Sequence, residues 1–319
     1  MTSAGSPPRP FRFGVQLRTA ESAGEWAGWA RRAEDAGYAV LSTPDHLAGP
    51  LGEQFSPLPA LAAAADATSR IRLGTWVLGN DFRHPAVLAK EAATLDWLSG
   101  GRLELGLGAG WMTEDYAGTG IPRDPPATRI RRLAEAVEVI RGLWGPGEFH
   151  FEGEHYRIRG LDGRPKPVQS PPPVQIGGGG ERILRLAGGA ADTVGLVMRL
   201  TGGARDAAAA RTATAAATDA KLAWIRDAAG ARREPPELNA RVLLCAVGEP
   251  LSTAAERLGR PLGLEESEIL ASPHACLGEV GRVCDHLSAC RERWGLTYFV
   301  VSADSLESFA PVVAQLAGR

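Results

Sequence analysis

The sequence is poor in residue types and patterns that several common enzyme classes require. Its 319 residues include only three lysines, Lys90, Lys166 and Lys221, and none follows an expected strand, which argues against a Schiff-base enzyme. The six histidines form neither an HxH nor an HExxH pattern, so a metal-dependent hydrolase is disfavoured and no metal site is expected. A GxSxG motif is also absent, which argues against an α/β-type serine hydrolase.

The sequence also lacks a basic run, a long apolar run and paired cysteines. With a net charge of −2, we expect no nucleic-acid partner and no attraction to an anionic membrane surface. No apolar segment reaches the ~18 residues of a membrane span. None of the four cysteines belongs to a CxxC pair, so we expect free thiols in a reducing cytosol rather than a disulfide or a zinc site. They are Cys245, Cys276, Cys284 and Cys290.

The start of the chain shows no targeting pattern. Residues 1–10 are small, polar and rich in proline, and they contain no apolar segment like that of a signal peptide. We therefore expect a disordered tail over residues 1–10 and a cytoplasmic protein.

Short apolar runs alternate with amphipathic segments along most of the chain. The apolar runs predict strands over residues 11–17, 38–44, 71–78, 102–107, 174–176, 192–197, 238–247 and 296–301. Helices are predicted over residues 22–36, 57–67, 84–98, 128–144, from 181 onward, 204–230, 278–294 and 305–316. Eight strands, each followed by a helix, give a closed parallel (β/α)8 TIM barrel more naturally than an open sheet. A typical barrel of ~250 residues with inserted segments would use this length.

Two segments interrupt this alternation. Residues 149–160 alternate apolar and polar side chains around a Gly-Glu turn and predict an exposed hairpin. Residues 164–173 are rich in proline and predict a stiff extended link. This link could also join two domains, but four strand–helix units lie on each side of it. We therefore expect one barrel domain over residues 11–319.

Active-site residues of a TIM barrel follow the C-terminal ends of its strands. Asp45 and His46 follow the second predicted strand; an imidazole there can exchange a proton near pH 7, and Asp45 can act as an acceptor. The alternative is that Asp45 caps a loop and His46 is merely half-buried. After the third strand, Gly79 and Asn80 either turn sharply toward a ligand or form a plain strand-to-helix turn.

Glycines cluster after the fourth strand in GLGAGW, residues 106–111. The spacing is GxGxG rather than GxGxxG, and helix-breaking residues follow, so a Rossmann dinucleotide site is rejected. The three glycines would let a flat ring approach the backbone closely, with Trp111 as a wall, and Gly108 and Gly110 are assigned to the cofactor site. The alternative is tight packing at the barrel rim.

A second glycine cluster follows the fifth strand and leads directly into a helix. Bare backbone amides at a helix N-terminus form an anion site that suits a phosphate group. A flexible loop is the alternative. The four glycines are Gly177, Gly178, Gly179 and Gly180.

Taken together, the motifs PDH (44–46), RHP (83–85), GLGAGW and GGGG resemble the luciferase-like monooxygenase superfamily, specifically its actinobacterial F420-dependent branch. The resemblance implies a barrel with inserted segments and a flavin-like ring in its mouth. His46 then matches a histidine near the reactive carbon of the ring, and Asp45 a residue that contacts the cofactor. Trp76-Val77 matches a non-proline cis peptide that supports the ring. Gly178 and Gly179 match phosphate-binding glycines.

One position departs from a related group of enzymes. Sugar-phosphate dehydrogenases of the superfamily place a glutamate acid where this chain has Trp111, which argues against a sugar-phosphate substrate. Glu114 is a candidate replacement for that acid, so Trp111 and Glu114 are assigned to the substrate pocket. The pocket is expected to be formed by residues 47–56, 111–127 and 199–206.

The resemblance implies hydride transfer between coenzyme F420 and a small organic substrate, with His46 protonating or polarising the substrate. The alternatives are an FMN-dependent monooxygenase that uses O2 and a non-catalytic flavin-binding barrel. If the cofactor is F420, we expect Arg182 and Arg185 to meet the carboxylates of its tail. We also expect a homodimer.

Overall fold

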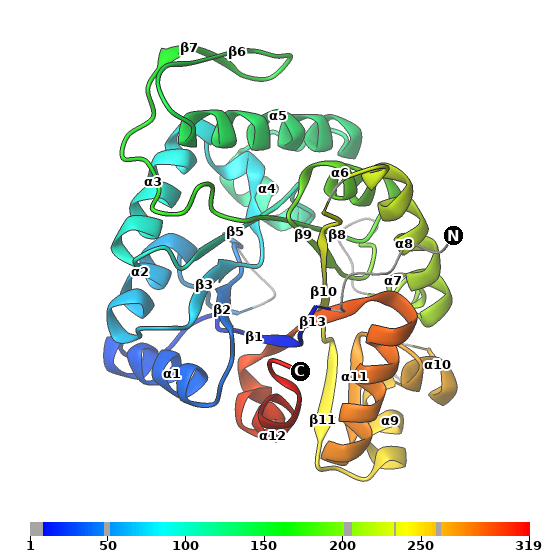
Figure 1. The fold of residues 1–319 in the computed structure, drawn as a ribbon. Helices are drawn as coiled ribbons and strands as arrows, with labels where there is room; N and C mark the ends of the chain where they lie inside the picture. The colour runs from blue at the N-terminus through cyan, green and yellow to red at the C-terminus, as the bar shows by residue number, and fades with distance from the viewer. Residues whose placement is uncertain (1–8, 48–51, 201–205, 233, 260–262) are drawn as a thin grey trace, which may run out of the picture.

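The architecture is a closed barrel of eight parallel strands that follow one another in sequence order (Figure 1). The structure is a computed structural model, and it describes residues 9–47, 52–200, 206–232, 234–259 and 263–319. Pairing of β3 with β5 and of β1 with β13 leaves no open edge. The fold predicted from the sequence is therefore confirmed. The barrel strands are β1 (Arg12–Gln16), β2 (Val40–Thr43), β3 (Arg72–Thr75), β5 (Leu103–Gly108), β8 (Val174–Gly178), β9 (Thr193–Leu196), β10 (Glu237–Arg241) and β13 (Leu296–Ser302).

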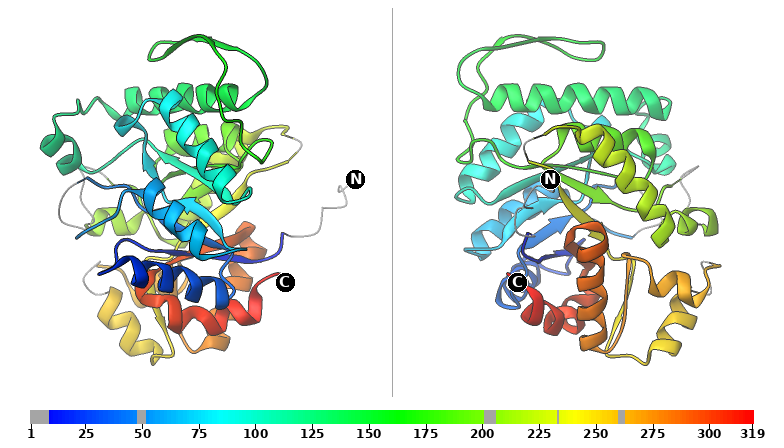
Figure 2. Two further views of the ribbon diagram at one scale, coloured as in Figure 1. Left: turned by 90° about the vertical axis from the view of Figure 1, so that its left-hand side faces the viewer. Right: turned by 45° about the vertical axis from the view of Figure 1, so that its right-hand side comes forward.

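Helices cover the outside of the barrel, as all the views show (Figures 1 and 2). The first begins where the sequence predicts, because the Ser22 hydroxyl accepts from the Glu25 backbone N–H at 3.1 Å and caps the helix. The principal helices are α1 (Ala23–Asp35), α2 (Pro57–Ala67), α3 (Pro85–Leu98), α5 (Pro126–Trp144), α6 (Glu181–Ala190), α8 (Ala215–Ala229), α11 (Val280–Trp294) and α12 (Leu306–Leu316). No helix within the described residues has both the length and the apolar composition that crossing a membrane requires.

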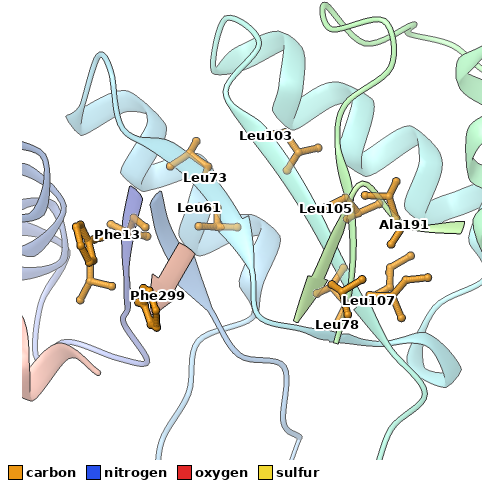
Figure 3. Close-up of a cluster of buried hydrophobic side chains, with 14 of the residues drawn as sticks. Phe13, Leu61, Leu73, Leu78, Leu103, Leu105, Leu107, Ala191 and Phe299 are labelled. Carbon is orange, nitrogen blue, oxygen red and sulfur yellow. The ribbon is translucent and has the colours of Figure 1, made fainter. Parts of the chain in front are cut away.

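The hydrophobic core lies between the strands and these helices. Alternate strand residues point outward into it, including Phe13, Leu73, Leu105 and Phe299, none of which is exposed (Figure 3). Because the alternate residues fill this layer, the intervening ones face the barrel interior.

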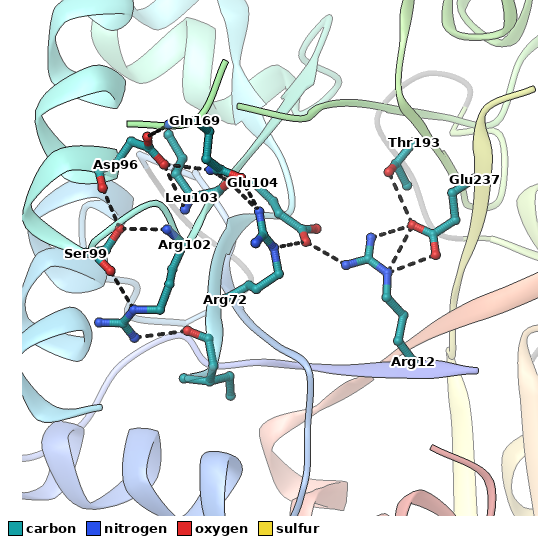
Figure 4. Close-up of polar contacts among 11 residues, drawn as sticks. Arg12, Arg72, Asp96, Ser99, Arg102, Leu103, Glu104, Gln169, Thr193 and Glu237 are labelled. Carbon is teal, nitrogen blue, oxygen red and sulfur yellow. Dashed lines mark hydrogen bonds and ion pairs between the residues drawn. The ribbon is translucent and has the colours of Figure 1, made fainter. Parts of the chain in front are cut away.

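A network of ion pairs between charged side chains fills the interior at the N-terminal end of the strands (Figure 4). Arg12 binds Glu104 at 2.6 Å and Glu237 at 2.9 Å, and its guanidinium lies 4.0 Å from the ring centre of Tyr298. Arg72 also binds Glu104. Burial alone would raise the pKa of Glu104, but the two guanidiniums outweigh it and lower that pKa. This end of the barrel is therefore closed by paired charges.

The seventh strand is shorter than the sequence predicts. β10 ends at Arg241, and the Leu243 and Leu244 N–H groups both donate to the His274 carbonyl, which turns the chain away from the barrel. A small unit follows, with its own apolar cluster around Ala254 and Ile269. It consists of β11 (Leu244–Val247), α9 (Leu251–Gly259), α10 (Glu266–Leu270) and β12 (Ala275–Gly278), and β11 pairs with β12.

Other departures are local. The helix predicted over residues 204–230 is interrupted between α7 (Ala207–Arg211) and α8, where Thr214 caps the second helix. A short helix, α4 (Thr113–Thr119), lies where breakers were expected. β4 (Leu78–Gly79) is a separate short strand, and β6 (Phe149–Glu152) with β7 (Arg157–Leu161) forms the predicted hairpin, which projects beyond α5 (Figure 2). The tail predicted over residues 1–10 lies outside the described residues up to residue 8.

Candidate active site

A cavity of about 580 Å³ lies at the C-terminal ends of the barrel strands, and most of the residues predicted for a site line it. The lining includes Asp45, His46, Trp76, Val77, Gly79, Gly108, Gly110, Trp111, Gly177, Gly178, Gly179 and Gly180. Two predicted residues lie outside the described lining. Asn80 is buried and donates to the Tyr156 hydroxyl at 3.4 Å, and Glu114 is exposed.

The predicted pocket loops contribute unequally. Gln54 lines the cavity, whereas residues 48–51 lie outside the described residues. From residues 111–127 the lining takes Trp111, Asp115, Arg123 and Pro126. From the last predicted segment Arg199 and Leu200 line it, and residues 201–205 lie outside the described residues.

His46 is held by a carboxylate that the sequence did not single out. Its Nδ1 lies 2.8 Å from Asp115 Oδ2, and the other oxygen of Asp115 accepts the Leu47 backbone N–H at 2.8 Å. The Asp115 side chain is only 2% exposed, and Trp111 packs edge-on against the imidazole with ring centres 5.3 Å apart. With Nδ1–H bound to a carboxylate, Nε2 is the nitrogen left to serve a substrate.

Asp45 is already engaged within the protein. Arg83 binds it through two nitrogens, at 2.6 and 3.2 Å, and the Gly79 N–H donates to it at 3.0 Å. The carboxylate therefore ties the end of β2 to the turn after β4. Asp45 lines the cavity, but in this arrangement it orders the rim.

The peptide bond between Trp76 and Val77 is cis, as the resemblance implied. Its side chains rest on glycines of neighbouring strands. A Cβ added to Gly108 would lie 2.6 Å from Val77 Cγ2, one on Gly177 would lie 3.0 Å from Val77 Cγ1, and one on Gly195 would lie 3.1 Å from the Trp76 ring. These glycines therefore make room for Trp76 and Val77, which form part of the cavity wall.

Gly110 has a comparable structural reason. Its φ of +71° favours glycine, and an added Cβ would collide with the Tyr116 hydroxyl. The neighbouring carbonyls of Ala109 and Gly110 accept from Arg129, which is 4% exposed. Burial, with the Asp81 carboxylate nearby, raises the pKa of Tyr116 to about 12, so its hydroxyl remains a donor. Tight packing thus explains both Gly108 and Gly110.

The four-glycine run forms a cradle at the N-terminus of α6. Gly178 and Gly179 are confined by the protein, since added Cβ atoms would collide with Ile183 and with the backbone of residues 197–199. Gly180, the N-cap, is more open, because the nearest atom to an added Cβ is Arg199 Cδ at 3.8 Å. No side chain caps the helix there. Backbone amides and the Arg199 cation therefore meet at one end of the cavity, as an anion site requires.

The comparisons with known proteins agree with this geometry. Residues 9–264 match the family model described as luciferase-like monooxygenase. The chain belongs to the luciferase-like monooxygenase family. Proteins of this family are enzymes, so the cavity is a candidate oxidoreductase site.

Three relatives illustrate the family. An uncharacterised protein of Mycobacterium tuberculosis is 34% identical over 189 residues, which cover 53% of this chain and 66% of the relative. An F420-dependent glucose-6-phosphate dehydrogenase of Nakamurella multipartita is 37% identical over 191 residues, covering 58% of this chain and 56% of that enzyme. The solved structure of the monooxygenase RslO1 from Streptomyces bottropensis has a TM-score of 0.74 and 25% identity, covering 96% of this chain and 97% of that one. The chain thus spans about two thirds or less of the length of the two curated relatives.

Within this luciferase-like site, the sequence analysis did not single out three residues, although two of them lie in the predicted pocket segments 111–127 and 199–206. Asp115, rather than its neighbour Glu114, faces the cavity and binds His46. Arg199 stands beside Gly180, whereas Arg185, expected to meet a cofactor tail, is bound to Glu181 and Asp227. The third, Arg129, holds the loop after β5.

Proposed function

We propose that this luciferase-like enzyme transfers a hydride between the deazaflavin coenzyme F420 and a small organic substrate. The observation that carries the proposal is that the His46–Asp115 pair and the α6 cradle line the same cavity. A proton-transfer group and an anion site in one cavity suit a substrate placed beside a phosphate-bearing redox cofactor. The F420-dependent relative from Nakamurella multipartita supports the choice of cofactor.

The residues present fit such a cofactor. Gly180 leaves open space at the N-terminus of α6, where no side chain caps the helix, and Arg199 adds a cation beside it. Trp76 and Val77 provide an apolar wall on the same cavity. When bound, F420 would supply a ring carbon that accepts or returns a hydride.

The protein itself would manage the proton that accompanies the hydride. His46 Nδ1–H is bound by Asp115, which fixes the orientation of the ring and leaves Nε2 to give a proton to the substrate or to take one from it. Trp111 packs on the imidazole and limits its movement. In substrate oxidation, a hydroxyl proton would pass to Nε2 as the hydride leaves the carbon; in reduction, both transfers run in reverse.

The second candidate is an FMN-dependent monooxygenase. The similarity to the monooxygenase RslO1, which covers 96% of this chain at 25% identity, favours it. FMN carries a phosphate on a ribityl chain, as F420 does, so the α6 cradle suits both cofactors. The third reading, a barrel that binds a flavin without catalysis, gives no role to the pair of half-buried His46 and buried Asp115.

The deciding experiment is a paired titration of cofactor-free protein with F420 and FMN, followed by turnover under air. Tight F420 binding with no oxygen consumption is expected. Micromolar or tighter FMN binding, negligible F420 binding and an oxygen-dependent product would replace the proposal with the monooxygenase.

A further inference from the structure

Lys221 is a buried lysine that the site described so far does not use. It lies in α8, is 2% exposed, and its Nζ donates to the carbonyls of Val197 at 2.7 Å and Thr212 at 2.6 Å. Burial lowers its pKa to about 7, and within the described part of the chain no carboxylate offsets that effect. An amine placed at this cost is expected to have a specific task.

One of its two acceptors lies directly against the glycine cradle. A Cβ added to Gly179 would lie 2.5 Å from the Val197 carbonyl oxygen, 2.5 Å from that of Met198 and 2.6 Å from the Arg199 nitrogen. The Val197 N–H also donates to the Gly178 carbonyl at 3.2 Å. Residues 197–199 are therefore clamped between the cradle on one side and Lys221 on the other.

The second acceptor, Thr212, closes a ring of contacts. Its hydroxyl accepts the Arg199 backbone N–H at 2.7 Å and donates to the Ala209 carbonyl at 2.6 Å. Lys221 therefore holds the segment 197–199 at two points: it binds Val197 directly, and it binds Thr212, which in turn binds Arg199. Lys221 and Thr212 do not line the cavity, yet they hold the backbone of Arg199, which lies beside Gly180.

We infer that Lys221 and Thr212 are positioning residues for the phosphate end of the cavity: they hold residues 197–199 against Gly179 and so place Arg199 beside the amides of α6. The inference rests on the proposed phosphate-bearing cofactor. If these contacts are lost, the segment carrying Arg199 can move away from the anion site, while the cavity wall formed by Trp76 and Val77 stays in place. The loss should therefore fall on ligands that carry the phosphate.

The test compares each cofactor with its phosphate-free counterpart. Wild type, Lys221→Met and Thr212→Val are titrated with F420 and with the same deazaflavin and ribityl chain lacking phosphate, and likewise with FMN and riboflavin. Both variants should bind the phosphate-bearing member at least ~10-fold more weakly, the scale of one lost charge-assisted hydrogen bond. Affinity for the phosphate-free member should stay within about twofold.

Matched variants separate positioning from general damage. Thr212→Ser keeps the hydroxyl and should bind like wild type, and Lys90→Met removes an exposed lysine of α3 and should change nothing. Thr212→Val keeps the inference testable if Lys221→Met does not fold. A phosphate preference retained in a folded variant, or equal loss of both ligands, would overturn the positioning role alone. A wild-type protein that binds both members equally well would overturn the phosphate site as well.

Discussion

The two ends of this barrel treat charge in opposite ways. At the N-terminal end, Arg12 and Arg72 are bound by Glu104 and Glu237 inside the barrel (Figure 4). At the C-terminal end, five arginines and only two carboxylates of the described residues line the cavity, and each of those carboxylates already binds a neighbour within the protein. The arginines are Arg18, Arg123, Arg129, Arg199 and Arg241.

This difference separates stability from function. Paired buried charges close the N-terminal end, which we call the lower end. Removing one charge of a pair leaves the other buried without its partner. The C-terminal end, which we call the upper end, has an excess of positive charge around the cavity, and this excess favours an anionic ligand. We therefore expect substitutions at the lower end to lower stability and substitutions at the upper end to lower binding or turnover.

The largest effect is expected for His46→Ala at the upper end. Removing the proposed proton-transfer group should lower kcat by ~10²–10⁴, while the melting temperature and cofactor affinity stay close to wild type. Steady-state kinetics and thermal unfolding measure the two properties. If Asp115 acts through His46, the double variant His46→Ala/Asp115→Asn should have nearly the same kcat as His46→Ala alone. A fully active His46→Ala enzyme would reduce the histidine to a packing role.

The converse change is Glu104→Gln at the lower end. Two guanidiniums would lose their shared carboxylate, and we expect the free energy of unfolding to fall by about 3–5 kcal/mol, as for other broken buried pairs. Urea unfolding measures the loss, and cofactor affinity of the folded fraction should be unchanged. Glu154→Gln, which breaks an exposed pair with Arg131, is the control and should leave the unfolding midpoint in place. Reduced cofactor affinity with intact stability would contradict the division between the ends.

A smaller effect is expected when one negative charge is added to the cradle. The extended backbone of Gly180, with φ −101° and ψ 159°, accepts any residue, and both Asp and Asn are good helix N-caps. Gly180→Asp should bind the phosphate-bearing cofactor at least ~10-fold more weakly than Gly180→Asn, because a like charge costs more than about 1 kcal/mol near a partly shielded site. The comparison is made by titration. Equal affinity of the two variants would place the phosphate elsewhere.

The smallest effect is a pH dependence that arises away from both ends. Burial, assisted by the Lys221 cation, lowers the pKa of His274 from 6.5 to about 3. Between these values the unfolded chain binds a proton that the folded protein does not, so stability falls as the pH falls. Lowering the pH from about 6.5 to about 5.5 should cost about 1 kcal/mol, measured by urea unfolding. His274→Asn should show a shallower dependence, and an unchanged slope would rule out this histidine as its source.

Much of the fold could be predicted because the apolar periodicity is strong. The barrel strands before residue 200 and the last strand lie within a few residues of their predicted places, except that the strand predicted over residues 71–78 is divided into β3 and β4. The apolar run continues past Arg241 without a glycine or proline, so the sequence could not show that residues 244–247 pair with β12 instead of continuing a barrel strand. That choice depends on the distant His274 carbonyl.

The site was predictable where it follows a strand and missed where it depends on orientation. Glu114 and Asp115 are neighbours on α4, and one residue along a helix turns the side chain by about 100°. Because the sequence showed no helix there, it offered no reason to prefer Asp115. Lys221 and Thr212 meet Val197 and Arg199 only through the folded chain, so no local pattern could link them.

The seat of Val77 on Gly108 and Gly177 has a consequence for redesign of the pocket. A methyl group on Gly108 would lie 2.6 Å from a methyl of Val77, so one of them would have to move, and a methyl group on Gly177 would make a tight contact at 3.0 Å. Gly108→Ala alone should therefore displace the wall, whereas Gly108→Ala together with Val77→Ala restores the room by moving volume from one strand to its neighbour. We therefore expect Gly108 and Val77 to depend on each other in any redesign of this wall, so that a library for this pocket should vary the two positions together.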